Sequence, residues 1–203
     1  MSKVILDLFC GAGGAAVGYH RAGFDVVGVD IKPQPHYPFE FIQADAMTFP
    51  LDGFDAIHAS PPCQRFLGVP GALKEAAYPD LLTPTRARFA TLDIPWVIEN
   101  VPTSPLEGFV LCGATFALPV VRHRVFATSR PMLVPSHCPQ RSWKRGTIHR
   151  GTYPYAHGSW RPDWREHVLP VIWPWMTLEE AGDAIPPAYT EYIGRELIKA
   201  VQG

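Results

Sequence analysis

Cys63 is the residue whose type and setting most directly suggest covalent chemistry. It stands in Ser60–Gln64 (SPPCQ), after an apolar run and before a long loop that contains glycine. A lone cysteine often serves as a small buried hydrophobic residue. Two stiffening prolines and the polar Gln favour an exposed thiol instead. A nucleophilic thiol needs a nearby cation or helix dipole to lower its pKa, and Arg122 and Arg124 are the candidate cations.

Glu99 offers a second reactive group. It ends Trp96–Glu99 (WVIE), a run with the character of a buried strand. A carboxyl in such a place is costly to ionise without a partner. This favours a protonated or proton-sharing Glu99 that polarises a ring nitrogen. A structural glutamate paired with an arginine would explain the residue equally.

A glycine loop suggests a bound nucleotide. Gly11-Ala12-Gly13-x-x-Ala16 follows a strand-like run, and Asp30 comes about twenty residues later, where it can hold both ribose hydroxyls. The same pattern suits a nicotinamide dinucleotide, or a tight turn between strand and helix. Asp45 is placed to accept from an adenine amino group or, alternatively, to cap a helix.

The elements that would position these residues alternate along the chain. Strands are predicted over Lys3–Phe9, Asp25–Val29, Phe41–Gln43, Phe54–Ala59 and Trp96–Glu99. Helices are predicted over Ala15–Ala22, Pro84–Ala90, Thr177–Ala184 with a Thr177/Glu180 capping box, and Tyr189–Val201. The alternation predicts an α/β fold, a mostly parallel sheet with helices on both faces. Ligands bind at the carboxyl ends of such strands, where the glycine loop, Asp30, Asp45, Cys63 and Glu99 are expected to lie.

The composition limits the class of protein and the cellular compartment that we expect. A chain of 203 residues suits one compact domain with a small appendage. It has no apolar run long enough for a membrane helix, and its N-terminus does not read as a signal peptide. The four cysteines are scattered, which argues against a disulfide framework or a C-x-x-C metal site and favours a reduced cytosolic compartment.

Charge is unevenly distributed. Between Arg130 and Arg165 there are seven basic residues and one acid, so this segment carries +6 and the remainder −7. The segment also holds Trp143, Tyr153, Tyr155, Trp160 and Trp164. This mixture suits phosphate contact and base stacking; a solvated basic loop, or the core of a small appendage, would account for it too. The spacing of His137, Cys138, His149 and His157 matches no standard zinc site, and Cys112 is expected to be structural.

These motifs resemble the DNA cytosine-5 methyltransferase family, in the family's order and over most of the chain. The matching segments are Asp7–Gly14, Asp30, Asp45, Pro62-Cys63-Gln64, Glu99-Asn100-Val101 and Arg122-His123-Arg124. The resemblance implies a Rossmann-like S-adenosylmethionine-dependent methyltransferase fold. Residues 1–130 and 174–203 would form the catalytic domain, and 131–173 a short target-recognition segment.

The resemblance also implies which residues bind S-adenosylmethionine and its product S-adenosylhomocysteine. Phe9 would contact the adenine, Asp30 the ribose, Ile31 the adenine face and Asp45 the amino group. The full implied set is Asp7, Phe9, Cys10, Gly11, Ala12, Gly13, Gly14, Asp30, Ile31, Asp45, Ala46 and Pro62. No metal is implied.

The implied reaction is methylation of a cytosine flipped out of duplex DNA, with Cys63, Glu99, Arg122 and Arg124 as catalytic residues. Cys63 would add to carbon 6, and Glu99 would stabilise the adduct at ring nitrogen 3 and the exocyclic amine. Arg124, and secondarily Arg122, would bind the cytosine carbonyl or a phosphate. The loop 64–82 would close over the base. We expect a monomeric protein of the bacterial or phage-infected cytoplasm, with no membrane contact.

The sequence departs from the family pattern at three places. Val120 stands where Gln is common, Ile185–Thr190 (IPPAYT) replaces the last motif with a variant typical of small phage and actinobacterial members, and the recognition segment is short. Three other functions remain open: a tRNA cytosine-5 methyltransferase, an amino methyltransferase (Ser60-Pro61-Pro62 matches its motif, but Cys63 replaces the aromatic residue), and a non-catalytic cofactor-binding module.

Overall fold

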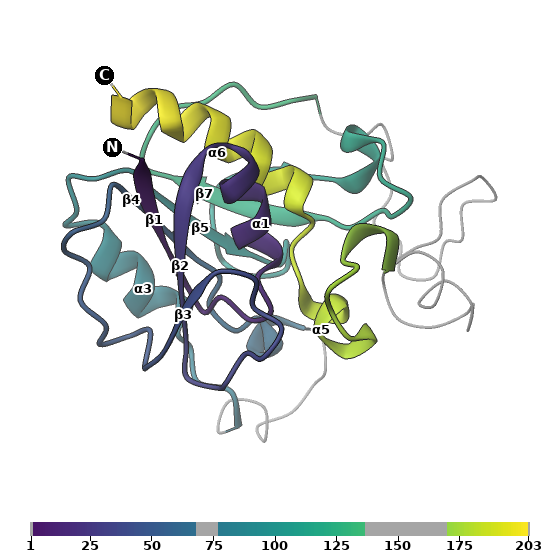
Figure 1. Ribbon diagram of the computed structural model, residues 1–203, viewed down its shortest axis with the longest axis horizontal. Coiled ribbons are helices and arrows are strands. Elements are labelled where there is room, and N and C mark those ends of the chain that lie inside the picture. Colours follow the sequence, from purple (N-terminus) through teal and green to yellow (C-terminus); the bar gives the residue numbers. More distant parts are fainter. Residues whose placement is uncertain (1, 68–76, 137–169, 203) are drawn as a thin grey trace.

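The computed structural model describes residues 2–67, 77–136 and 170–202 (Figure 1). Its described part contains a seven-stranded sheet with the order β3-β2-β1-β4-β5-β7-β6. The strands are β1 (Lys3–Leu8), β2 (Phe24–Asp30), β3 (Glu40–Gln43), β4 (Ala56–Ala59), β5 (Trp96–Asn100), β6 (Phe109–Leu111) and β7 (Arg124–Thr128). The helices are α1 (Gly14–Arg21), α3 (Leu82–Phe89), α5 (Leu178–Asp183) and α6 (Pro187–Gln202).

Strand direction decides where the reactive residues meet. Strands β1 to β5 pair in parallel, so their carboxyl ends lie along one edge of the sheet. β7 pairs antiparallel with both β5 and β6. The first residue of β7 therefore lies at the same edge as the last residue of β5. This mostly parallel sheet, with its crossover helices, confirms the predicted fold class.

Two hydrophobic layers cover the sheet. On one face α1 and α6 pack against it, with Tyr19, Phe24, Phe126 and Tyr189 in the buried cluster. On the other face α3 contributes Leu82 and Phe89 to a cluster that includes Leu6, Ile57 and Ile98. Both faces are therefore shielded from water, as a parallel sheet requires.

Close contact between α1 and α6 depends on glycine. A side chain at Gly18 would collide with Thr190, and one at Gly194 would approach Ala22 to 2.7 Å. The Thr190 hydroxyl also donates to the carbonyl of Ala15 over 2.8 Å. These contacts hold the C-terminal helix against the helix that follows the glycine loop.

Several of the predicted helices and strands differ from those in the structure. Strands β6 and β7 were not predicted, because short runs among prolines and glycines carry little periodicity. Helix α3 begins two residues before Pro84, which lies in its first turn, where proline costs no hydrogen bond. Helix α6 begins at Pro187 rather than Tyr189. The Thr177/Glu180 capping box is confirmed.

The basic and aromatic residues expected to contact DNA, from Arg141 to Arg165, lie outside the described residues, as do His137, Cys138, His149 and His157. The flanking ends are described. Met132 packs against the α1–α6 cluster, and Trp173 is fully buried beside Val120 and Ala181. Among the described helices, none combines the length and the apolar character needed to span a bilayer.

Candidate active site

The chain turns sharply at Cys63. The residue follows β4 and precedes a single 3₁₀ turn, Gln64–Phe66, in which the Phe66 amide donates to the Cys63 carbonyl over 2.8 Å. Asn100, at the end of β5, donates from Nδ2 to the Pro61 carbonyl over 2.9 Å. Because Asn100 is buried, this hydrogen bond fixes the segment that carries Cys63 to the neighbouring strand.

The thiol of Cys63 is partly buried. Burial raises its pKa, the positive charge of Arg124 lowers it, and the negative charges of Glu99 and Asp183 raise it, with a raised pKa as the net direction. The expectation of a lowered thiol pKa is therefore wrong for this state of the protein. Arg124 acts on the thiol as predicted, but it does not outweigh burial.

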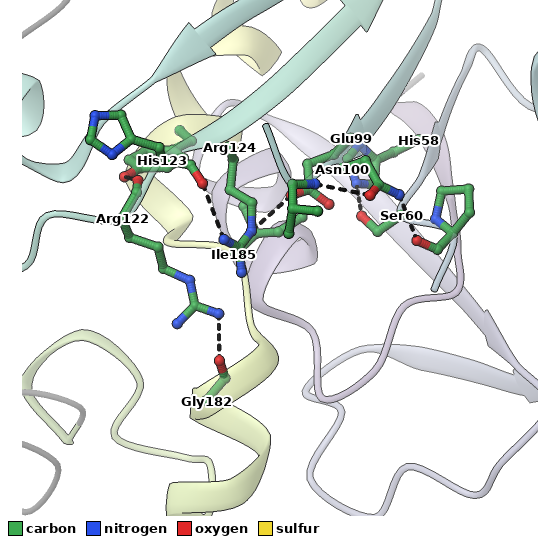
Figure 2. A network of polar contacts seen from close by, with 12 residues as sticks. His58, Ser60, Glu99, Asn100, Arg122, His123, Arg124, Gly182 and Ile185 are labelled. Carbon is green, nitrogen blue, oxygen red and sulfur yellow. Dashed lines mark hydrogen bonds and ion pairs between the residues drawn. The ribbon is translucent and has the colours of Figure 1, made fainter. Parts of the chain in front are cut away.

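Glu99 and Arg124 form a buried ion pair. Glu99 Oε1 lies 2.9 Å from Arg124 Nε, and both side chains are almost fully buried. The contact is an ion pair without a hydrogen bond, because Glu99 Oε1 accepts no hydrogen bond among the described residues. The pair forms because antiparallel β7 brings its first residue to the end of β5. Figure 2 shows the two side chains facing each other.

Burial raises the pKa of Glu99, while the positive charges of Arg124 and Arg122 and a hydrogen bond from Ser60 lower it. The net direction is upward. Both sequence-based interpretations of Glu99 thus describe part of the structure: the carboxyl is paired with an arginine, and its burial favours the protonated form. A buried carboxyl with a raised pKa holds a proton more readily than an exposed one and is suited to donate or share it with a bound base.

Arg122 points away from Glu99 (Figure 2). Its guanidinium donates to the carbonyls of Ala181 (3.3 Å) and Gly182 (2.6 Å) and lies over the ring of Trp173. The Tyr189 hydroxyl donates to the Arg122 carbonyl. The structure therefore does not bring Arg122 together with Cys63 and Glu99. Arg122 instead connects the end of α5 to the segment that leads into β7.

The glycine loop has an unusual backbone. Phe9, Gly11 and Gly13 all have left-handed φ angles, of 57°, 48° and 85°. The turn directs the Gly11 amide to Asp30 Oδ2, at 3.1 Å, while the Lys32 amide donates to Oδ1 over 3.0 Å. A side chain added at Gly11 would meet nothing within 4 Å. The loop backbone is thus open to a ligand at that point.

The predicted cofactor-binding residues separate into two groups. Phe9, Gly11, Asp30, Ile31, Asp45 and Pro62 are exposed or half-buried along the edge of the sheet. Ile31 is 66% exposed, which leaves its side chain accessible to a planar ligand. Asp45 caps its own turn by accepting from the Met47 amide over 2.9 Å, so the capping interpretation also holds.

In the second group, Asp7, Cys10, Ala12, Gly13, Gly14 and Ala46 are buried in the protein. A side chain at Gly14 would approach the Ile185 carbonyl to 2.5 Å, and Ala46 belongs to the hydrophobic cluster on the α3 face. These positions shape the loop through packing, and only their backbone can approach a ligand.

Asp7 is a special case in that group. It is fully buried, and neither carboxyl oxygen makes a hydrogen bond of normal geometry among the described residues. Burial and the negative charge of Asp30 raise its pKa well above the usual value, partly offset by contact with the Tyr37 hydroxyl. Burial therefore favours the neutral form of the Asp7 carboxyl beneath the glycine loop.

Sequence reasoning missed three supports of the site. Trp175 donates from Nε1 to the Ala12 carbonyl over 2.9 Å and so ties the C-terminal region to the glycine loop. Tyr37 lies against Gly13 and Gly28. His58, in mid-strand, was an available signal, because a histidine in an otherwise apolar buried run requires polar partners.

Comparisons with known proteins find methyltransferases that are similar to part of this chain. No family model matches the chain. The type II methyltransferase M1.HphI of Haemophilus parahaemolyticus is 32% identical, over 32% of this chain and 22% of that protein. The chain thus matches about a fifth of that relative's length.

Two solved structures are also similar. One is DNMT2 of Spodoptera frugiperda, with 22% identity, 63% of this chain and 49% of that chain covered, and a TM-score of 0.49. The other, assigned as a DNA modification methyltransferase encoded within an E. coli prophage, has 22% identity, 62% and 45% coverage, and a TM-score of 0.48. The sheet order of this chain itself is that of a Rossmann-like α/β protein.

Within the described ranges, no group of three or more His, Cys, Asp or Glu residues is arranged to hold a metal ion. Cys63, Glu99 and Arg124 supply a thiol, a carboxyl and a guanidinium to the site.

Proposed function

We propose that this protein is an S-adenosylmethionine-dependent DNA cytosine-5 methyltransferase that acts through a covalent adduct on Cys63. The observation that carries the proposal is the Glu99–Arg124 ion pair, which lies beside Cys63 at one edge of the sheet. A thiol, a carboxyl of raised pKa and a guanidinium are the groups that nucleophilic addition to a cytosine ring requires.

The glycine loop fits S-adenosylmethionine, which supplies an electrophilic methyl group and carries a sulfonium and an ammonium charge. The Asp30 carboxyl at the loop, with the buried Asp7 carboxyl beneath it, favours such a cation over the anionic pyrophosphate of a nicotinamide dinucleotide. Asp30 would hold the ribose hydroxyls, Ile31 and Phe9 the adenine, and Asp45 its amino group. The open backbone at Gly11 leaves room for the ligand.

In the proposed reaction, the Cys63 thiolate adds to carbon 6 of a cytosine flipped out of the duplex. The new sulfur–carbon bond converts the ring into an enamine whose carbon 5 is nucleophilic and takes up the methyl group. Glu99 holds a proton at ring nitrogen 3 while the adduct exists, and Arg124 orients Glu99 and binds the cytosine carbonyl. Loss of the proton at carbon 5 then expels Cys63.

The raised thiol pKa has a consequence for this reaction. Because burial favours the neutral thiol, adduct formation requires loss of its proton. Arg124 stabilises the thiolate that results.

Transfer of labelled methyl groups to duplex DNA, with bisulfite sequencing of plasmid from expressing cells, tests the proposal. We expect modification at carbon 5 of cytosine, in a context that the sequencing reveals. Methylation of tRNA without any of duplex DNA would refute the DNA substrate. A Cys63→Ala variant that methylates as fast as wild type would refute the covalent step.

A further inference from the structure

A line of polar side chains runs behind Glu99, and the reaction proposed above makes no use of it. The Tyr19 hydroxyl lies 2.9 Å from His58 Nδ1, and His58 Nε2 lies 2.7 Å from Ser60 Oγ. Ser60 directly follows β4, whose last residue Ala59 pairs with Ile98 of β5, so Ser60 lies beside Glu99, and a side-chain hydrogen bond from Ser60 lowers the pKa of that carboxyl. Figure 2 shows His58 and Ser60 on the side of Glu99 that faces away from Arg122.

Burying the imidazole of His58 at this position is energetically unfavourable. It is fully buried in β4, between β1 and β5, and its strand neighbours are Ile57 and Ala59. A buried imidazole costs free energy unless both ring nitrogens have partners. Burial lowers the pKa of His58 to about 3, so the ring is neutral at physiological pH. An apolar residue would fill this position without needing Tyr19 and Ser60.

A neutral imidazole has one donor and one acceptor, so the line of hydrogen bonds has a direction. An ionised carboxyl can only accept, which requires Ser60 to donate to Glu99. Ser60 Oγ is then free to accept from His58 Nε2–H, and His58 Nδ1 accepts from the Tyr19 hydroxyl. In this direction every donor has an acceptor.

We propose that Ser60 and His58 are positioning residues that fix the orientation and the proton affinity of Glu99 during cytosine methylation. The inference rests on the function proposed above. Ser60 acts on Glu99 directly, and His58 acts through Ser60 by orienting its hydroxyl. Arg124 pairs with the carboxyl from β7, and Ser60, in the position after β4, acts on it from the neighbouring strand.

Other charged or titratable groups also act on this carboxyl and must be kept constant in a test. They are Arg122 and Arg124 at the start of β7, Cys63 after β4, and Tyr19 on α1. Substitutions at Ser60 leave all of them in place. Ser60→Ala removes the hydroxyl, and Ser60→Thr retains it, so the two variants form a matched pair.

The first measurement is the ionisation of Glu99 in the free protein, followed by the carboxyl ¹³C signal of labelled glutamate and assigned with Glu99→Gln. Loss of a hydrogen bond to a carboxylate raises its pKa, and we expect a rise of about one unit in Ser60→Ala. Ser60→Thr should titrate as wild type does. His58→Phe should shift the midpoint in the same direction as Ser60→Ala, and His20→Phe, an exposed histidine on α1, should not shift it.

The second measurement is the pH dependence of single-turnover methyl transfer. Because Glu99 must hold a proton, the rate falls as pH rises through its pKa, and Ser60→Ala should move this decline upward by the same amount. A variant that only loosens the fold would lower the rate without moving the decline. Thermal unfolding of each variant verifies that it folds.

The outcomes separate the two proposals. Identical Glu99 midpoints in wild type and Ser60→Ala would overturn the inference, and so would a shifted midpoint with an unmoved rate profile. If wild type methylates no cytosine in DNA, the proposed function fails, whereas the ¹³C titration still determines whether Ser60 and His58 control Glu99.

Discussion

Asn100 on β5 holds the Pro61 carbonyl through a buried hydrogen bond of 2.9 Å, and Pro61 lies two residues before Cys63. The Asn100 side-chain oxygen also accepts from the Val101 amide over 2.9 Å. One side chain therefore satisfies two buried backbone groups and fixes the distance between the strand that carries Glu99 and the turn that carries Cys63.

Replacing Asn100 with Ala should destabilise the protein and slow methyl transfer together. Both backbone groups lose their partner in a buried place, at a cost of about 1–3 kcal/mol each in the free energy of unfolding. Urea denaturation measures the loss. As a control, Gln43→Ala removes an exposed hydrogen bond to the Ile31 carbonyl and should cost far less. Equal costs for the two variants would contradict the role given to Asn100.

Arg124→Met should make the stability of the protein strongly dependent on pH. Without the guanidinium, the pKa of Glu99, already raised by burial, rises further above its value in the unfolded chain. Stability is then retained at low pH and lost as pH rises through the folded-state pKa. We expect the variant to be closest to wild type at acidic pH and to lose about 3–5 kcal/mol once Glu99 is ionised without its partner.

The double variant Glu99→Gln/Arg124→Met serves as the control for that prediction, because it removes the titrating group. Its free energy of unfolding should change between pH 5 and pH 8 by no more than that of the single variant Glu99→Gln. A pH-dependent loss that persists in the double variant would assign the effect to another residue.

Arg122→Lys should lower stability with little change in cofactor affinity. A lysine cannot donate to both Ala181 and Gly182 while lying over Trp173, and we expect a loss of about 1–3 kcal/mol. Arg195→Lys, in an exposed pair with Glu191, should cost less than about 0.5 kcal/mol. A catalytic Arg122 would instead show a fall in kcat with unchanged stability.

Asp30→Asn should weaken S-adenosylmethionine binding by at least about tenfold, or about 1.4 kcal/mol. The substitution removes a carboxylate held by the Gly11 and Lys32 amides beside the open loop. Asp52→Asn, a substitution of an exposed aspartate outside the loop, is the control. Calorimetric titration measures both, and equal affinities would contradict the placement of the cofactor.

Most of the parallel sheet could be predicted from the sequence because β1, β2, β4 and β5 are apolar runs that end in polar residues at one edge. The antiparallel pair β6–β7 could not. Phe109–Leu111 is short, and no local sequence pattern in Arg124–Thr128 indicates whether that strand runs parallel or antiparallel to β5. That direction places Arg124 on Glu99. The same limitation left Arg122 and Arg124 indistinguishable: Arg122 precedes β7 and donates to carbonyls at the end of α5, whereas Arg124 is the first residue of β7 and pairs with Glu99.

The raised pKa of Cys63 was also beyond prediction from the sequence. Two prolines and a polar Gln do indicate a turn at the end of β4, and the structure has one. How far the thiol is buried depends on packing that only the fold defines. The balance between burial and Arg124 is therefore a property of tertiary structure.

Covalent trapping on duplex DNA that contains 5-fluorocytosine tests the central claim most directly. Fluorine at carbon 5 cannot leave as a proton does, so the methylated adduct should persist. With S-adenosylmethionine present, we predict a protein–DNA complex whose mass spectrum locates the linkage at Cys63, and no such complex with Cys63→Ala. A wild-type protein that methylates cytosine in DNA without forming the complex, or a complex linked through another residue, would contradict the account.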